Sequence, residues 1–460
     1  MCMKHYINIL KTKSSFFNTF FSNDNRSTVV KKNIVASLLI KICSIVISLL
    51  IVPITLGYIS TELYGIWLTL SSIIVWFHFF DIGFTLGLKN RLAEAIAVSD
   101  WKRSKSLIST TYFMMIAIFL PLCILLEFIV PCVNWAKLLN ISEIYNTDII
   151  RVMYALCIFL CIQMVVNVIV SVVAAFQKVA LSQAFSVVGQ LLSLVAIFLC
   201  REYMEPSLLT LAFVLSALPI IVMIVATIYL FSTKYKNIAP SFRAINTSHI
   251  KDIFGLGIKF FLIQIQVVIL FQTTNFLISN ISGPNDVTSY NIAYKYLSVA
   301  MMVFNIALTP LWPAFTDAKV KQDYTWMKNV YQKFKKLYMV LLIGIILMAL
   351  IAPFVYKLWI GEMAIIPYNM TALVAIYIVI YSWDSLQVTL LNGIGTIKLQ
   401  TYITLIGMII HIPLSFLFGK YIGALGVVVS MILINLLYST IFTIQVRKIL
   451  NQRAEGIWIK

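Results

Sequence analysis

Long apolar runs, each bounded by charged or turn residues, recur along nearly the whole chain and decide what it can fold into. A helix needs about 20 mostly apolar residues to cross about 30 Å of hydrocarbon. Twelve such runs occur in the 460 residues. They cover 33–58, 63–88, 109–131, 152–175, 183–200, 208–231, 254–281, 287–312, 337–359, 368–391, 400–418 and 422–446. The sequence therefore predicts an all-α polytopic membrane protein with twelve transmembrane helices.

The composition excludes the other classes. Hydrophobic residues make up 61% of the chain and charged residues only 11%, whereas about a quarter of a soluble domain is charged. The 35 Lys+Arg against 17 Asp+Glu give a net charge of +18. A basic balance can indicate a nucleic-acid partner, but in a membrane protein Lys and Arg gather in the cytoplasmic loops. We therefore expect no nucleic-acid partner, and we interpret the excess of Lys and Arg as an indication of which loops are cytoplasmic.

Placing alternate loops on two sides tests the number of spans. Of the 35 basic residues, 27 fall on one side, five on the other and three inside spans. A missed span would mix the two groups, so the positive-inside rule predicts cytoplasmic N- and C-termini. The first 30 residues have no apolar core followed by a small-residue cleavage site. We expect a cytoplasmic tail there and not a signal peptide.

The two halves of the chain resemble each other weakly. Ser99-Asp100-Trp101 corresponds, 223 residues later, to Gln322-Asp323-Tyr324. Six spans per half give both repeats the same orientation, which predicts two six-helix lobes with a cavity between them. The predicted parts are a cytoplasmic tail (1–32), an N-lobe (33–232), a cytoplasmic linker (233–253), a C-lobe (254–446) and a second tail (447–460).

The long loops after spans 2 and 8 have the pattern of surface helices. In the second loop, apolar residues recur at intervals of three or four on one face, at Val320, Tyr324, Met327, Tyr331 and Phe334. Asp100 and Asp323 are well placed to cap the helices that follow them. These segments are expected to be interfacial helices that brace each lobe.

Three lysines lie inside the spans. Lys41 and Lys259 have matched positions in the two halves, about 9–12 Å from the cytoplasmic ends of spans 1 and 7 at 1.5 Å per residue. Lys295 lies about eight residues into span 8 from the outer face. Intramembrane charges generally mark a substrate or ion pathway. Together the three could present ammonium groups to an anion between the lobes, or each could simply snorkel to the membrane surface.

Two intramembrane carboxylates are candidates for coupling transport to an ion. Asp81 lies about seven residues from the cytoplasmic end of span 2, and Asp384 has a comparable depth in span 10. Aspartate is too short to snorkel and requires a proton, a cation or a neighbouring lysine as partner. His78 lies one turn before Asp81, so the two could form a proton pair, although a packed histidine is the commoner arrangement.

No catalytic constellation is visible. The outer loops are short, the four histidines are scattered at 5, 78, 249 and 411, and no glycine-rich phosphate loop with its lysine occurs. An ATPase, a metalloenzyme and an enzyme with a large extracytoplasmic domain are therefore disfavoured. We expect a transporter without a cofactor, in which H⁺ or Na⁺ is the coupling ion.

Several motifs, in this order, resemble those of the O-antigen and polysaccharide flippases, Wzx-type members of the larger group that includes the MATE exporters. The resemblance extends from about residue 30 to 446. Its most specific pieces are Leu63-Tyr64-Gly65-Ile66-Trp67, Asp81-Ile82-Gly83, Leu88-Lys89-Asn90-Arg91-Leu92-Ala93-Glu94-Ala95, Tyr290-Asn291-Ile292-Ala293-Tyr294-Lys295, Pro310-Leu311-Trp312-Pro313-Ala314-Phe315-Thr316-Asp317-Ala318 and Leu391-Asn392-Gly393-Ile394-Gly395.

The resemblance implies a MATE-like fold and a function. Such a protein moves an oligosaccharide on undecaprenyl diphosphate from the cytoplasmic to the periplasmic leaflet of the bacterial inner membrane, by alternating access. Its expected partners are this substrate, membrane lipids and the polysaccharide polymerase with its chain-length regulator. Lys41, Lys259 and Lys295 would meet the diphosphate.

Two other functions remain open. A multidrug antiporter of the same fold would need a carboxylate-rich cavity for cations, against which the three lysines argue. A membrane enzyme such as an O-antigen polymerase normally has one large periplasmic loop, and no loop of that size occurs.

Overall fold

The backbone is helical throughout, as a chain in hydrocarbon requires. No water is available inside a bilayer to satisfy backbone amides, so each span satisfies them within its own helix. The computed structural model describes residues 25–459 except 177, 251–272, 310 and 397. Over these residues the secondary structure consists of helices and turns, without a strand. The predicted all-α class is confirmed for this part of the chain.

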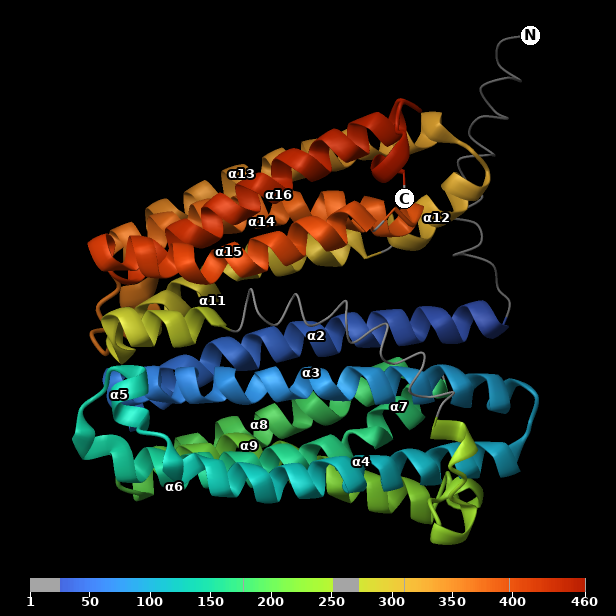
Figure 1. Cartoon of the computed structure of the whole chain (residues 1–460), viewed down its shortest axis with the longest axis horizontal. Helices are drawn as coiled ribbons and strands as arrows, with labels where there is room; N and C mark the ends of the chain where they lie inside the picture. The colour runs from blue at the N-terminus through green and yellow to red at the C-terminus, as the bar shows by residue number, and fades with distance from the viewer. Residues whose placement is uncertain (1–24, 177, 251–272, 310, 397, 460) are drawn as a thin grey trace.

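The first half of the chain forms one helical bundle, the N-lobe, drawn from blue to green in Figure 1. Long helices run side by side along the bundle, and α2 has its most extensive contact with α8. The helices are α2 (Asn25–Tyr58), α3 (Thr61–Ala97), α4 (Trp101–Ile129), α5 (Trp135–Leu139), α6 (Asn146–Val166), α7 (Val168–Ala175), α8 (Val179–Tyr203) and α9 (Leu208–Ser232).

The second half forms a separate bundle, the C-lobe, drawn from yellow to red. Helix α14 is its centre, because it contacts α11, α12, α13 and α16. A helical segment at 273–282 precedes the first complete helix. The helices are α11 (Pro284–Leu308), α12 (Leu311–Val320), α13 (Tyr324–Ile360), α14 (Tyr368–Ile394), α15 (Lys398–Ile422) and α16 (Ala424–Leu450).

Among the described residues, ten helices are long and apolar enough to cross a membrane, and each coincides with a predicted span. The predicted span 63–88 lies within α3, a helix of 37 residues. Most of the predicted span 254–281 lies outside the described residues. The described part of the chain is therefore a multi-pass membrane protein, and the total of twelve spans stays a prediction.

The expected surface helices are not separate elements. Residues 324–334 form the first turns of α13, which continues without a break to Ile360. In the same way α4 begins at Trp101 and includes the predicted span 109–131. Helix propagation costs less than starting a new helix, so an amphipathic segment without a breaker extends the span that follows it. The predicted fourth span, 152–175, is instead divided in two, because Asn167 separates α6 from α7.

The two capping aspartates have the same local geometry. Asp100 accepts a hydrogen bond from the amide of Arg103 at 2.9 Å, and Asp323 accepts one from the amide of Trp326 at 2.9 Å. The residues before them, Ser99 and Gln322, have φ angles of 58° and 55°. Both predicted caps are confirmed. The equivalent turns also support the weak repeat between the two halves.

Charge separates the two ends of the bundle. The basic end carries the start of α4 with Lys102, the turns with Lys234 and Lys321, and the end of α16 with Arg447, together with α12 on the right of Figure 1. The opposite end carries α5, the beginnings of α3 and α11, and the ends of α13 and α15. The positive-inside rule predicts that the basic end is cytoplasmic.

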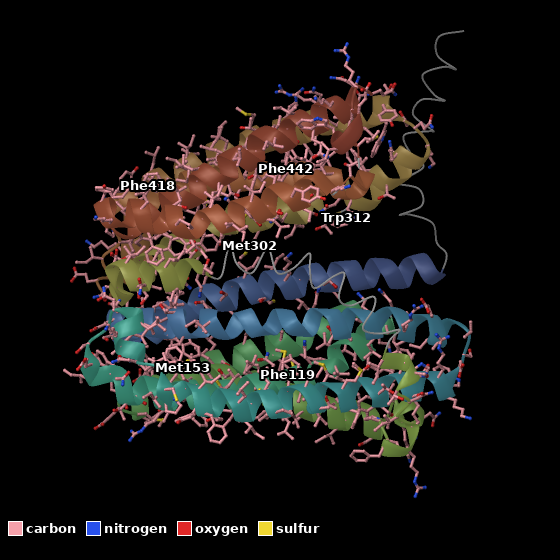
Figure 2. All side chains as sticks on the ribbon, viewed as in Figure 1. Phe119, Met153, Met302, Trp312, Phe418 and Phe442 are labelled. Carbon is pink, nitrogen blue, oxygen red and sulfur yellow. The ribbon has the colours of Figure 1, made fainter. Side chains whose placement is uncertain are left out.

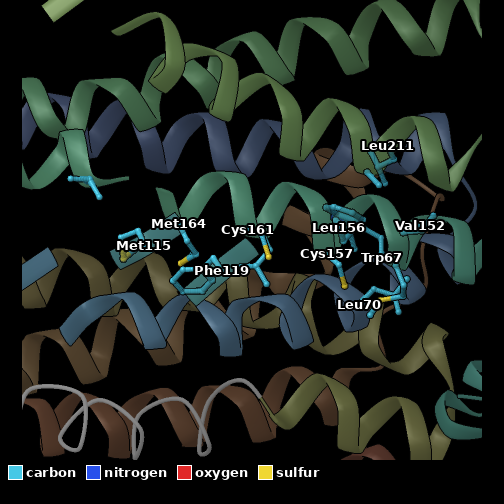
Figure 3. Close-up of a cluster of buried hydrophobic side chains, with 14 of the residues drawn as sticks. Trp67, Leu70, Met115, Phe119, Val152, Leu156, Cys157, Cys161, Met164 and Leu211 are labelled. Atoms are coloured by element: carbon cyan, nitrogen blue, oxygen red, sulfur yellow. The ribbon is translucent and has the colours of Figure 1, made fainter. Parts of the chain in front are cut away.

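Close packing of apolar side chains holds the N-lobe together (Figure 3). Trp67 of α3, Phe119 of α4, Cys157 and Cys161 of α6, and Leu211 of α9 belong to one buried cluster. Lipid tails are as apolar as these side chains, so burial here gains little from the removal of water, and van der Waals contact supplies the stability. The stability of the N-lobe therefore depends on how closely the facing surfaces of its helices fit together.

The two lobes are sealed together near the opposite end. Six hydrogen bonds between described residues join them, and Gly65 of α3 lies so close to Pro284 of α11 that a Cβ atom there would overlap the Pro284 carbonyl. The bonds are Thr61–Met363 (2.7 Å), Asn275–Leu68 (3.4 Å), Ser279–Leu139 (2.8 Å), Asn280–Leu138 (2.8 Å), Thr288–Thr61 (2.8 Å) and Trp359–Leu49 (3.0 Å). We call this set of contacts the seal.

Candidate functional site

The structure describes the side chains of three of the six predicted site residues, Lys41, Lys295 and Asp384. Lys259 lies outside the described residues, within 251–272. His78 and Asp81 lie in α3, in a stretch whose side chains are also outside the described part. The geometry of the site therefore rests on two lysines and one aspartate.

Lys41 lies on a face of α2 that is buried near the seal and exposed toward the basic end. Val52 and Thr55 follow it by about three and four helical turns, so all three side chains share one face. Val52 belongs to a buried cluster that also includes Tyr356 of α13, and Thr55 is fully buried, but Lys41 is exposed. The face exposed along the whole helix is a different one, marked by Leu50. Lys41 is thus placed where α2 borders the space between the lobes.

Lys295 lies near the middle of α11, deeper than the sequence predicted. It follows Pro284 by about 16 Å and precedes Leu308 by about 20 Å along the helix. One turn earlier on the same face, Asn291 donates a hydrogen bond to Asn275 at 2.8 Å, and Asn275 donates to Leu68 O of the N-lobe at 3.4 Å. Lys295 therefore follows the last polar contacts of the seal.

The side chain of Lys295 is half-buried and has no carboxylate within 4.0 Å among the described residues. Figure 2 shows Met302, two turns further along α11, and Trp312 of α12 on the side of the C-lobe that faces α2. A cation at this depth is costly without an anion. Lys41 and Lys295 are therefore two cations, one in each lobe, of the kind that a phosphate group would neutralise.

Asp384 lies in the interior of the C-lobe and not between the lobes. It is 4% exposed, and neither carboxylate oxygen accepts a hydrogen bond from the described residues. It lies near Tyr338 of α13, Tyr377 and Tyr381 of α14, and Tyr438 of α16. An unpaired buried anion costs several kcal/mol. A proton or a small cation would neutralise this carboxylate.

One face of α14 gathers polar atoms around this carboxylate. Tyr377, Tyr381, Asp384 and Gln387 follow one another at intervals of four, three and three, which places them on one side of the helix. The Tyr377 hydroxyl and Gln387 Nε2 are buried without a hydrogen-bond partner among the described residues, while Tyr331 of α13 donates to Gln387 Oε1 at 3.2 Å. Hydroxyl and amide oxygens here could share a cation with Asp384.

A row of tyrosine rings connects Asp384 to the helix that carries Lys295. The ring centroids of Tyr290 and Tyr294 are 5.8 Å apart, those of Tyr294 and Tyr377 6.4 Å, and those of Tyr377 and Tyr381 5.8 Å. Tyr290 and Tyr294 belong to α11, and Tyr377 and Tyr381 to α14. Packed rings of this kind transmit a displacement of one helix to the next. A movement of α11 would therefore reach the surroundings of Asp384.

Sequence reasoning missed two polar contributors. The spacing of Tyr377, Tyr381 and Gln387 relative to Asp384 could have identified the polar face of α14. His411 of α15 could not be found in this way, because it stands alone in its span. It is fully buried, and its Nδ1 atom lies 2.9 Å from the hydroxyl oxygen of Ser430 on α16. His411 is therefore a second buried titratable group in the C-lobe. Among the described residues no cluster of three or more His, Cys, Asp and Glu side chains could hold a metal ion.

Two lysines lie close together at the basic end of the N-lobe. Lys178 precedes α8, Lys234 follows α9, and their side chains are within hydrogen-bonding reach of each other. Next to them, the rings of Phe176 and Tyr235 stack with centroids 4.5 Å apart. Burial lowers the pKa of Lys178 from 10.5 to about 8, with a further contribution from the hydrogen bond and charge of Lys234. Charged Lys178 therefore opposes folding.

The substitution Lys178→Met should raise the thermal unfolding midpoint of the detergent-purified protein at pH 7. The folded protein holds this proton less tightly than the unfolded chain, so the gain should be complete below pH 8, fall between pH 8 and 10.5, and vanish above that range. The exposed Lys236→Met variant is the control and should show no such dependence. A gain for Lys178→Met that is the same at pH 7 and pH 10.5 would contradict this account.

Comparison with protein families gives one match. A family model described as polysaccharide biosynthesis protein matches residues 30–319, more than half of the chain. None of the curated proteins matches.

Solved structures of transporters share the fold. A multidrug resistance MATE family transporter of the MOP superfamily, in an inward-facing conformation, is 14% identical, with a TM-score of 0.76 over 91% of this chain and 98% of the other. An outward-facing MATE transporter of that superfamily is also 14% identical, with a TM-score of 0.63 over 93% and 97%. A MOP superfamily transporter from Pyrococcus furiosus, described as having a binding pocket of reverse polarity, is 14% identical, with a TM-score of 0.59 over 89% and 96%. The fold is therefore MATE-like.

Proposed function

The chain belongs to the polysaccharide biosynthesis protein family, and from this premise we propose that it is a flippase for an undecaprenyl-diphosphate-linked oligosaccharide. It takes the lipid-linked unit from the cytoplasmic leaflet of a bacterial inner membrane and releases it in the periplasmic leaflet, as in the assembly of O-antigen or another surface polysaccharide. The observation that carries the proposal is that Lys41 of the N-lobe and Lys295 of the C-lobe form no salt bridge with the described residues.

The charges suit the most polar part of this substrate. A diphosphate entering from the basic end meets Lys41 first and Lys295 deeper, beside the seal. Lys259 is proposed as a third ligand from its matched position in the sequence. Each ammonium gives the phosphates a compact positive charge that compensates for lost hydration. The undecaprenyl chain stays in the bilayer, so the cavity has to accommodate only the headgroup.

The seal determines the energy of the conformational change. Hydrogen bonds between transmembrane helices contribute about 0.6 kcal/mol each on average, so the six in the seal amount to about 4 kcal/mol. One elementary charge moved through 100 mV supplies about 2.3 kcal/mol. Two such charges supply about 4.6 kcal/mol, so an ion gradient that moves two of them is a sufficient source for opening the seal. We propose that H⁺ or Na⁺ binds at Asp384, with Asp81 and His78 as further candidates.

A multidrug antiporter is the second candidate, because the structural relatives include multidrug MATE transporters. Its cationic substrates would need carboxylates between the lobes. Asp384 lies inside the C-lobe, and the two described charges that we assign to the substrate path are lysines. The geometry therefore favours an anionic substrate. A polysaccharide polymerase and its chain-length regulator are the proposed protein partners, since they use the flipped unit.

Complementation tests the function and its lysines together. In the native strain, deletion of the gene without any other flippase present should abolish surface polysaccharide and trap the lipid-linked unit in the cytoplasmic leaflet. Wild-type protein should restore export. Lys41→Ala and Lys295→Ala should each lower export by about tenfold at unchanged protein level, because each removes a charge-assisted contact to the diphosphate.

Lys420→Ala is the matched control, since Lys420 is an exposed lysine at the opposite end of the bundle. It should export normally. Normal export in the deletion strain would overturn the proposed function. Normal export by both lysine variants and by their double mutant would instead show that Lys41 and Lys295 only anchor their helices.

Asp384→Asn should uncouple transport from the ion gradient. The amide is nearly isosteric with the carboxylate but binds neither a proton nor a cation at this site, so proteoliposomes should lose the stimulation that an imposed pH or Na⁺ gradient gives. The readout is the flipping rate of a fluorescent undecaprenyl-diphosphate sugar. Asp148→Asn removes an exposed carboxylate and should keep the full stimulation. Equal stimulation of Asp384→Asn and wild type would rule out Asp384 as the coupling group.

A further inference from the structure

Two adjoining cavities form a groove along α13 at the basic end of the C-lobe, with α16 opposite the smaller cavity and Trp383 of α14 beside the larger one. One has a volume of about 460 Å³ and the other about 360 Å³. They share Gln332 and Lys335 on one wall, so they are two parts of one groove. In Figure 1, α13 and α16 lie on the side of the C-lobe that is remote from the N-lobe. This groove is therefore separate from the proposed substrate path.

The groove is cationic on both walls. Lys328, Lys335 and Lys336 line it from α13, and Arg447 lines it from α16. No carboxylate lines either cavity, and none of these four groups forms a salt bridge with the described residues. Lys335 also lies over the ring of Tyr331, 5.1 Å from its centroid. Four cations on two helices thus surround a space that has no anion of the protein's own.

The floor of the larger cavity is an aromatic residue of α14. Trp383 packs edge-to-face on Tyr338 with centroids 4.9 Å apart, and its indole donates a hydrogen bond to Thr443 Oγ1 of α16 at 2.8 Å. Trp383 thereby fixes the separation of α13 and α16. Its surface and that of Met339 make this cavity mainly apolar. The two cavities therefore differ, with a charged part and an apolar part side by side.

The depth of the groove matches the surface of the bilayer. Counting about 30 Å of hydrocarbon back from Ile360 along α13 reaches Val340, so Lys335 and Lys336 lie just outside the hydrocarbon and Met339 lies at its edge. Beyond Met339 the same face of α13 carries Ile343, Ile346 and Leu350, all exposed. These side chains form an apolar track that leads from the groove into the membrane.

We propose that the groove along α13 binds one anionic phospholipid, with its phosphate between Lys335 and Arg447 and an acyl chain along Met339 and the exposed face of α13. Basic residues near a membrane surface are common, because the positive-inside rule requires them. Such residues are usually dispersed and solvated. Here they line opposite walls of a cavity that continues as an apolar track, and that combination matches the two chemical parts of a phospholipid.

The bound lipid would adjoin the coupling site. Tyr331 lines the charged part of the groove and donates a hydrogen bond to Gln387, one turn from Asp384, while Tyr338 lines the apolar part. The lipid would therefore hold α13 and α16 in position around the polar face of α14. The proposal concerns a binding site and does not depend on which substrate is transported.

Lipid binding to the full-length protein tests the proposal. Native mass spectrometry of protein released from neutral detergent would compare dioleoyl-phosphatidylglycerol with dioleoyl-phosphatidylcholine. Wild type should retain one phosphatidylglycerol in preference to phosphatidylcholine. The double variant Lys335→Gln/Arg447→Gln should weaken phosphatidylglycerol binding by about tenfold or more, since each basic group near a membrane surface contributes to anionic-lipid attraction.

The matched control is Lys333→Gln/Arg453→Gln, which removes the same charge from exposed residues outside the groove. It should change binding less than twofold. An equal loss in both double variants would overturn the proposal in favour of general surface attraction. So would equal retention of the two lipids by wild type.

A third variant separates a lipid from a soluble anion. Met339→Glu places a negative charge at the apolar part and should weaken phosphatidylglycerol binding while leaving protein yield unchanged. Inorganic phosphate and glycerol phosphate, at concentrations matched to the lipid, should not displace phosphatidylglycerol from wild type. Displacement by either would show that the groove takes a soluble phosphate and would contradict the lipid assignment.

Discussion

The absence of water from the bilayer core is the constraint on which the rest of this structure depends. Backbone amides must be satisfied within each span, so the chain becomes a set of long helices. Charges are expelled to the ends of the bundle, which concentrates Lys and Arg at one of them. The few charges that remain at depth then require a specific reason, and Lys41, Lys295 and Asp384 are the described examples. Each lies where a partner from outside the chain could neutralise it.

The two lobes have packed cores of their own and meet through the seal. Hydrogen bonds and the close approach of Gly65 to Pro284 join the lobes near the opposite end, while Lys41 is exposed toward the basic end. Such an arrangement favours rigid-body rocking, because a seal of a few hydrogen bonds is easier to break than a packed core. The tyrosine row from α11 to α14 gives this movement a physical connection to Asp384.

Much of the fold could be predicted because spans and caps are local. Each helix of the described residues that is long and apolar enough to cross a membrane coincides with an apolar run in the sequence. Asp100 and Asp323 correctly predicted where two helices begin. The continuous helix from Tyr324 to Ile360 was not expected, because a change from an amphipathic to an apolar pattern does not by itself end a helix. The site could be predicted only in part. Depth in a span made Lys295 and Asp384 candidates, and spacing along α14 could have indicated its polar face. The contacts of that face with tyrosines of α11 and α13 depend on tertiary packing, which the sequence pattern does not show.

Side-specific thiol labelling tests the central claim, that the protein is open at its basic end and closed at the other. In a chain without its native cysteines, Met302→Cys lies on α11 beside the space between the lobes, and Thr288→Cys lies within the seal. A membrane-impermeant thiol reagent should modify Met302→Cys when applied from the side of the basic end, and Thr288→Cys should resist it from both sides. Rapid labelling of Thr288→Cys from the opposite side, with protection of Met302→Cys, would contradict the account.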